Sequence, residues 1–193
     1  MEGLLYENSA VLPEDMHPGT SCFFTGHRFL SPVQLKHMYP ALVRSVLQAA
    51  EDGCRYFISG GAMGFDLVAA RTILLLRQEF RRDIHLVLAL PCRNQTERWL
   101  YGSRGMENIR QYSEVKALAG TVVYMQDFYT TGCMKVRNQY MADHAGRCIA
   151  FWSGAKRGGT YQTVCIARKA GIPVWNVYPA VLEDGEAGYL PEA

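Results

Sequence analysis

The chain has 193 residues, of which 49% are hydrophobic, and its 20 Lys and Arg nearly balance its 18 Asp and Glu, giving a net charge of +2. This length and apolar content suffice for one globular domain with a buried core, so intrinsic disorder is excluded. The longest stretches without a charged residue have 12 residues, whereas a membrane helix needs about 20 apolar residues, so we expect no membrane span. The charge is spread along the chain without a basic run, and the sequence therefore disfavours nucleic acid as a partner.

The N-terminal residues and the cysteines indicate the cellular compartment. Residues 1–15 contain four acidic residues and no Lys or Arg, so the basic start of a secretory signal is absent. The six cysteines are at least 15 residues apart, so no C-x-x-C pair is present for zinc or redox chemistry. We therefore expect a cytoplasmic protein with reduced cysteines and no metal site.

Short apolar runs alternate with segments of helical periodicity along the chain. The runs predict buried strands over residues 21–24, 56–58, 84–90, 121–125, 148–152 and 174–177. Apolar residues between them recur with helical spacing, for example over 35–49 and 67–77. This alternation predicts an α/β fold of the Rossmann-like, doubly wound type, with a mostly parallel sheet of about six strands and helices on both faces.

The same pattern predicts where the domain and its helices end. We expect an N-terminal extension over residues 1–19, a single domain over 20–178 and a polar C-terminal tail over 179–193. Four glycines lie just before predicted strands and are expected to end helices in the left-handed conformation: Gly53, Gly120, Gly146 and Gly171.

Three loops rich in glycine follow predicted strands at one edge of the sheet, over residues 25–28, 59–66 and 153–160. In open α/β sheets ligands bind at this edge, where helix N-termini attract anions. The second loop contains Gly60, Gly61, Ala62 and Gly64, whose backbone could approach a phosphate closely. Neither the dinucleotide fingerprint nor the P-loop spacing is present, and each loop alone could equally be a tight turn without a ligand.

Asp66 follows the second loop in the first turn of a predicted helix. It either caps the helix or accepts hydrogen bonds from ribose hydroxyls. In the third loop, Gly158, Gly159 and Thr160 open another helix, with Thr160 as the expected N-cap. Together with Lys156 and Arg157 this segment either cradles a phosphate or only caps the helix beside two solvated charges.

Two further pairs of polar residues lie near the same edge. Thr25, Gly26, His27 and Arg28 follow the first strand, where Arg28 could bind a phosphate with two parallel hydrogen bonds. His27 is an acid, a base or a structural hydrogen-bonding group. Arg137 and Asn138 lie early in the helix expected after the fourth strand, and these two residues either contact a ligand or tie helices together.

With these motifs in order, residues 22–177 resemble the YpsA family, within the SLOG superfamily that joins DprA to the LOG enzymes. The resemblance rests on Thr25-Gly26-His27-Arg28, Gly60-Gly61-Ala62 with Gly64 and Asp66, Pro91 with Gln95 and Trp99, Arg137-Asn138 with Met141 and Asp143, and Gly158-Gly159-Thr160. Cys92 stands where the family has an aromatic residue, which should alter packing more than chemistry. The resemblance implies a Rossmann-like domain whose glycine loops hold a nucleotide-derived ligand.

The resemblance does not imply a known reaction. LOG enzymes carry a catalytic glutamate after their glycine motif, and the matching position here is Thr163. Whether the chain is an enzyme therefore stays open, and no catalytic residue is assigned.

Three functions follow as hypotheses. The first is binding or sensing of a nucleotide or ADP-ribose-like ligand through the loops, with no other cofactor implied. The second is N-glycosidic chemistry on nucleotides, with Asp66 on the ribose and His27 or Asp143 assisting the leaving base. The third, drawn from DprA, is single-stranded DNA binding through residues such as Arg93, Arg98 and Trp99. A homo-oligomer is compatible with each.

Overall fold

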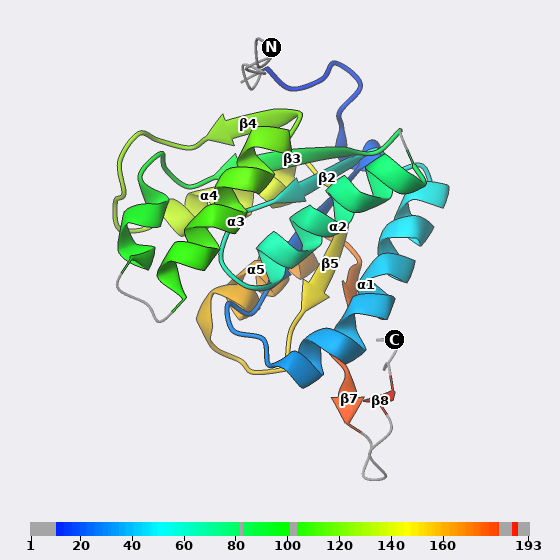
Figure 1. The fold of residues 1–193 in the computed structure, drawn as a ribbon. Helices are drawn as coiled ribbons and strands as arrows, with labels where there is room; N and C mark the ends of the chain where they lie inside the picture. Colours follow the sequence, from blue (N-terminus) through cyan, green and yellow to red (C-terminus); the bar gives the residue numbers. More distant parts are fainter. Residues whose placement is uncertain (1–10, 82, 101–103, 182–186, 189–193) are drawn as a thin grey trace.

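The protein folds around a single six-stranded parallel sheet with helices on both faces (Figure 1). The structure is a computed structural model, which describes residues 11–81, 83–100, 104–181 and 187–188. The strands lie close to the predicted apolar runs: β1 Ser21–Gly26, β2 Tyr56–Ser59, β3 His85–Leu90, β4 Thr121–Tyr124, β5 Arg147–Phe151 and β6 Val174–Asn176. The predicted Rossmann-like architecture is confirmed.

The order of the strands places a crevice beside β1. The sheet runs β4-β3-β2-β1-β5-β6, so the chain moves outward from β1 to β4 and then returns to the other side of β1 as β5. The connections leaving β1 and β5 therefore diverge at the carboxyl ends of these two strands. Such a switch point is where open α/β sheets bind ligands.

Five helices cover the sheet in two groups. One face packs against α1 Pro32–Glu51, α2 Phe65–Glu79 and α3 Gly105–Leu118, and the other against α4 Cys133–Asp143 and α5 Gly158–Lys169. Two short 3-10 helices, η1 Pro18–Thr20 and η2 Gln95–Trp99, complete the domain. No helix in these described ranges is long and apolar enough to cross a membrane.

Alternating side chains of the strands build two separate cores. In β1, Phe24 faces the α1–α3 side and Phe23 faces α4 and α5, as the two-residue period of a strand requires. Strand residues on the α4/α5 side include the small Ala89 and Ala150, whereas Phe57 lies on the α1–α3 side. The runs read as continuously apolar because both faces of the sheet are buried.

Two of the four expected helix stops adopt the left-handed conformation. Gly53 and Gly171 have φ of +99° and +70°, which confirms the prediction for these positions. It is wrong for Gly120 and Gly146, which do not have positive φ. Helix α3 instead ends at Ala119 in extended backbone, and a Cβ on Gly146 would lie 2.5 Å from the Pro18 carbonyl oxygen, so close packing explains that glycine.

The segments outside the sheet also have structure. In the expected N-terminal extension, Met16 is buried and Asp15 accepts a hydrogen bond from the Tyr56 hydroxyl at 2.5 Å, so residues 11–19 pack on the domain. Residues 1–10 of that extension lie outside the described residues. In the expected tail, β7 Ala180–Val181 pairs antiparallel with β8 Ala187–Gly188 and lies apart from the main sheet in Figure 1.

Candidate functional site

A cavity of about 460 Å³ opens at the carboxyl ends of β1 and β5, bounded by the first turns of α4 and α5. Eleven of the fourteen residues predicted from the sequence to bind a ligand line it: Thr25, Gly26, His27, Arg28, Ala62, Asp66, Arg137, Asn138, Gly158, Gly159 and Thr160. They come from four connections that are far apart in the sequence. The sheet edge predicted from the sequence therefore borders a cavity in the structure.

Five lining residues were not on that predicted list. Arg157, Met141 and Thr163 are named among the sequence motifs but not among the predicted ligand-binding residues, and Phe29 and Met134 are missed altogether. Met134 precedes Arg137 and Asn138 by three and four residues, so helical spacing places all three on one face of α4. That signal could have found Met134, whereas nothing beyond adjacency to Arg28 marks Phe29.

The three predicted glycines that do not line the cavity lie behind it and are packed against other groups. A Cβ on Gly60 would lie 1.4 Å from Nη1 of Arg137. A Cβ on Gly64 would lie 2.3 Å from the carbonyl oxygen of Arg28, and Gly61 has φ of +61° with Leu90 2.7 Å from its Cβ position. These glycines let the second loop pack tightly rather than present backbone to the cavity.

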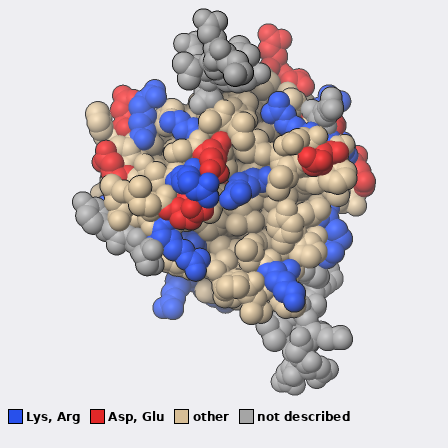
Figure 2. All heavy atoms as spheres, viewed as in Figure 1, with Lys and Arg blue, Asp and Glu red and all other residues tan. Residues whose placement is uncertain are grey.

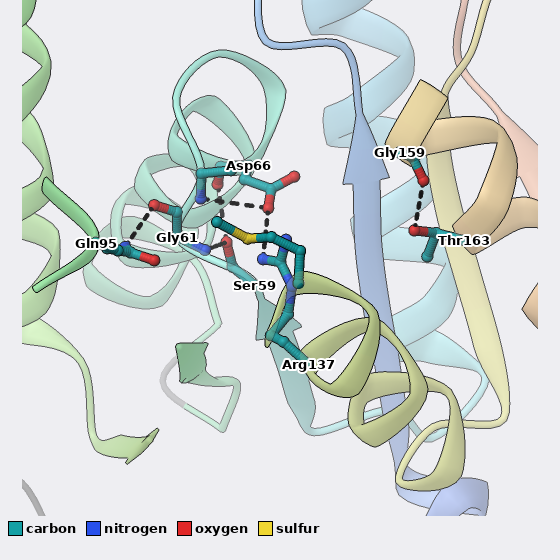
Figure 3. Close-up of polar contacts among 9 residues, drawn as sticks. Ser59, Gly61, Asp66, Gln95, Arg137, Gly159 and Thr163 are labelled. Carbon is teal, nitrogen blue, oxygen red and sulfur yellow. Dashed lines mark hydrogen bonds and ion pairs between the residues drawn. The ribbon is translucent and has the colours of Figure 1, made fainter. Parts of the chain in front are cut away.

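The inner wall of the cavity contains a buried ion pair. Arg137 reaches from α4 toward the loop before α2, where its Nη1 lies 3.5 Å from Oδ2 of Asp66 (Figure 3). The two side chains are only 8% and 6% exposed. The same carboxylate oxygen accepts a hydrogen bond from the Ala62 backbone N–H at 3.4 Å, so its contacts are long for hydrogen bonds to a charged group.

This pair leaves one buried polar atom unsatisfied. Nε of Arg137 has no hydrogen-bond partner within the described part of the chain. Burial raises the pKa of Asp66 despite the opposing charge of Arg137, and burial likewise lowers the pKa of Arg137. A buried charge normally has all its hydrogen bonds made, so the described part of the site lacks an acceptor for Nε of Arg137.

The outer wall is the exposed N-terminus of α5. The prediction of Thr160 as N-cap is wrong, because the N-cap is Arg157, three residues earlier, and α5 begins at Gly158. No side chain among the described residues makes the capping hydrogen bond. Cβ atoms built on Gly158 and Gly159 would meet nothing within 4 Å. The first N–H groups of α5 are therefore open toward the cavity, where a helix N-terminus attracts anions.

His27 connects the loops after β1 and β5. Its Nε2 accepts a hydrogen bond from the Ser153 backbone N–H at 3.0 Å and also lies 3.0 Å from the Ser153 hydroxyl. Accepting an N–H requires the unprotonated nitrogen, and burial lowers the pKa of His27. The geometry therefore favours the structural role among the alternatives for this residue.

Several other residues considered for the second and third hypotheses are engaged by the protein or lie away from the cavity. Thr163 lines the cavity, but its hydroxyl donates to the Gly159 carbonyl at 2.9 Å (Figure 3). Asp143 does not line the cavity. Of the residues considered for DNA, Arg93 pairs with Asp127, Arg98 lies over the Tyr129 ring, and Trp99 packs against the core.

Comparison with known proteins identifies the family. A family profile described as the YspA SLOG family, YpsA, matches residues 31–171. The uncharacterized SPbeta prophage-derived protein YoqJ of Bacillus subtilis is 24% identical over 137 residues, which cover 64% of this chain and 76% of YoqJ. A UPF0398 protein of Bacillus cereus strain B4264 is 25% identical over 158 residues, covering 80% of this chain and 74% of the relative.

Solved structures of DNA processing protein A share the fold. The protein from Helicobacter pylori, described by its single-stranded DNA binding mode, superposes with a TM-score of 0.55 at 19% identity, over 81% of this chain and 64% of its own. The Streptococcus pneumoniae protein, DprA, gives 0.57 at 17% identity, over 88% and 53%. This chain thus spans about half to two thirds of those proteins.

These neighbours correct one expectation. The sequence argued against a nucleic-acid partner from net charge, and that argument is wrong because a chain with this fold binds single-stranded DNA. Net charge averages over the whole surface, and Figure 2 shows acidic and basic side chains mixed over the face of α1–α3. A few basic residues at the edge of one cavity change the net charge of the whole chain very little.

Proposed function

The chain belongs to the YpsA family of SLOG proteins, and we propose that its cavity binds a nucleotide or nucleotide-derived ligand through phosphate and ribose. The observation that carries this proposal is the Nε of Arg137, which is buried in a residue that lines the cavity and has no acceptor among the described residues. A ligand oxygen there would complete the guanidinium's hydrogen bonds. This hydrogen bond would contribute strongly to binding, because leaving a buried charged group without a partner costs free energy.

The charge balance of the lining favours an anionic ligand. The charges of Asp66 and Arg137 balance each other, so the lining has two further positive charges, on Arg28 and Arg157. Both are exposed, and neither forms an ion pair with any residue that the structure describes. Together with the open N-terminus of α5 they provide donors and positive potential for a phosphate.

Asp66 supports a sugar beside that phosphate. Its carboxylate is buried at the inner wall, and its contacts with Arg137 and Ala62 are long. Ribose hydroxyls are donors that fit a carboxylate, as in other nucleotide folds. The ligand's hydroxyl would stabilise the ionised form and offset the effect of burial on the pKa of Asp66.

The cavity supports binding better than N-glycosidic catalysis. Asp66 is the one carboxylate among its lining residues, and Arg137 occupies it. The hydroxyl of Thr163 is engaged by its own helix. We therefore assign no catalytic residue and place binding or sensing first.

Calorimetric titration tests the proposal, using the 5′-mono- and diphosphates of adenosine, guanosine, cytidine and uridine. We expect saturable binding of at least one probe, weakened at least about tenfold by Arg157→Ser, since a charge-assisted hydrogen bond contributes about 1.5–3 kcal/mol. Arg71→Ser, on the outer face of α2 and away from the cavity, is the matched control. Absence of binding across the panel would contradict the proposal.

Single-stranded DNA is the second candidate, supported by the fold shared with the Helicobacter pylori protein. A labelled oligothymidylate at low salt tests it by fluorescence anisotropy. Binding that weakens steeply with added salt would support it, and unchanged anisotropy at low salt would exclude it.

We also propose the cytoplasm as the compartment. All six cysteines are free and five of them are buried, which suits a reducing environment. Localisation of a fluorescent fusion tests this assignment.

A further inference from the structure

A second hollow of about 340 Å³ lies between α4 and α5, next to the cavity. We call it the α4/α5 groove. Its lining includes Lys135 and Asn138 of α4, and Tyr161, Cys165, Ile166 and Lys169 of α5. None of these residues except Asn138 lines the cavity, so the function proposed above does not explain the groove.

Asn138 connects the two hollows. It lines both of them and is only 6% exposed. No hydrogen bond joins its side-chain amide to another described residue, and the amide is not among their fully buried unsatisfied groups. The amide is therefore accessible where the cavity meets the groove, at the point where a ligand would pass from one to the other.

The groove has the chemistry of a second nucleoside site. The Tyr161 ring is held by stacking on Trp152, with centroids 6.1 Å apart and planes at 24°. Lys135 and Lys169 are exposed at the groove and have no ion-pair partner among the described residues. An aromatic face beside cations is a general arrangement for binding a base and its phosphate.

The length of α5 separates the two binding ends. Gly159 and Lys169 are ten residues apart on one helix, which corresponds to about 15 Å at the α-helical rise. A ligand that reaches both the N-terminus of α5 and Lys169 is therefore longer than a single mononucleotide.

Resting on the proposed function, we infer that the ligand has two nucleoside units joined through phosphate. One unit lies in the cavity and the other in the α4/α5 groove. The Asn138 amide hydrogen-bonds the linkage between them, and Tyr161 stacks on the second base.

Calorimetry with matched probes tests this inference: each nucleoside 5′-monophosphate and the corresponding dinucleoside diphosphate. Tyr161→Ala and Lys169→Ser should each weaken binding of the dinucleoside diphosphate about tenfold, as expected for one lost stacking or charged contact. Both should leave the monophosphate affinity within about twofold. Arg157→Ser should weaken both probes, because it lies at the shared cavity. Tyr39→Ala and Lys36→Ser, both on α1, are the matched controls.

Each remaining outcome overturns a different statement. Equal affinity for the two probes, unaffected by the groove variants, overturns the two-unit ligand and leaves the proposed function standing. Failure of every probe to bind overturns the proposed function itself. Binding of an oligothymidylate that depends on Tyr161, without binding of the dinucleoside diphosphates, identifies nucleic acid as the occupant of the groove and overturns the inference. If Tyr161→Ala does not fold, the affinity of Lys169→Ser for the dinucleoside diphosphate tests the inference.

Discussion

The two glycine loops at the cavity use the same residue in opposite ways. In the loop before α2, a side chain on Gly60 or Gly64 would collide with Arg137 or with the Arg28 carbonyl. At the start of α5, Cβ atoms on Gly158 and Gly159 would meet nothing within 4 Å. Glycine in the first loop allows protein to pack on protein, whereas glycine in the second leaves backbone open to a ligand.

This difference divides the cavity into two walls: a tightly packed wall around Asp66 and an open wall around Gly159. Around Asp66 the packing determines where Arg137 lies, so that the buried charges are in place before any ligand arrives. Around Gly159 the donors are exposed, so that ligand oxygens can replace the water bound to them. Stability should therefore depend on the first loop and affinity on the second, which the following substitutions test.

Gly60→Ala should have the largest effect. Its Cβ would occupy the place of the Arg137 guanidinium, 1.4 Å from Nη1, and would force that charge away from Asp66. Because breaking a buried ion pair typically costs about 3–5 kcal/mol, we expect at least that loss in the free energy of unfolding, measured by urea denaturation.

Gly159→Ala is the matched control in the other loop. This position has no positive φ and open space around it, and alanine is favoured over glycine in a helix. We expect a gain of up to about 1 kcal/mol. Equal losses for the two variants would contradict the division into two walls.

Arg137→Met should rank next, with a loss of about 3–5 kcal/mol, because it leaves the Asp66 carboxylate buried without its cation. The double variant Asp66→Asn/Arg137→Met removes both charges and should recover most of that loss. A double variant as unstable as the single one would show that the pair is needed for packing rather than for charge compensation. Urea unfolding of all three chains provides the comparison.

His27 should produce a smaller, pH-dependent effect. Burial lowers its pKa in the folded protein below the ordinary value of about 6.5, so the unfolded chain binds more protons between these two values. The free energy of unfolding should therefore fall as the pH drops below about 6.5, down to the folded pKa. His27→Gln can still accept the Ser153 N–H and should lose less stability on acidification.

His85, whose pKa is also lowered, titrates in both chains of that experiment. The difference between wild type and His27→Gln therefore isolates His27. Parallel pH profiles of the two chains would count against the hydrogen bond from Ser153.

Arg157→Ser should have the smallest effect on stability, within about 0.5 kcal/mol, because Arg157 is exposed and caps nothing with its side chain. Its effect on nucleotide affinity should be large by contrast, as proposed above. Thermal unfolding without ligand measures the first quantity. A strongly destabilised variant would mean that the charge is part of the fold rather than of the binding edge.

Most of the fold and much of the site could be predicted from local patterns. Apolar runs identify strands whose two faces are both buried, and loops that follow strands of a parallel sheet meet at one edge. This reasoning placed Thr25, Asp66 and Gly159 around one cavity. It failed for Gly60, because the sequence does not reveal which side chain packs against a glycine.

By itself, the sequence determined the architecture, because hydrophobic periodicity depends only on neighbouring residues. It also determined the sheet edge where a ligand would bind. Only the tertiary structure decided that Arg137 crosses from α4 to Asp66, that three predicted glycines lie behind the cavity, and that Asn138 joins it to a second groove. These relations join residues from different connections, and no local pattern encodes distances between segments that meet only when the sheet has formed.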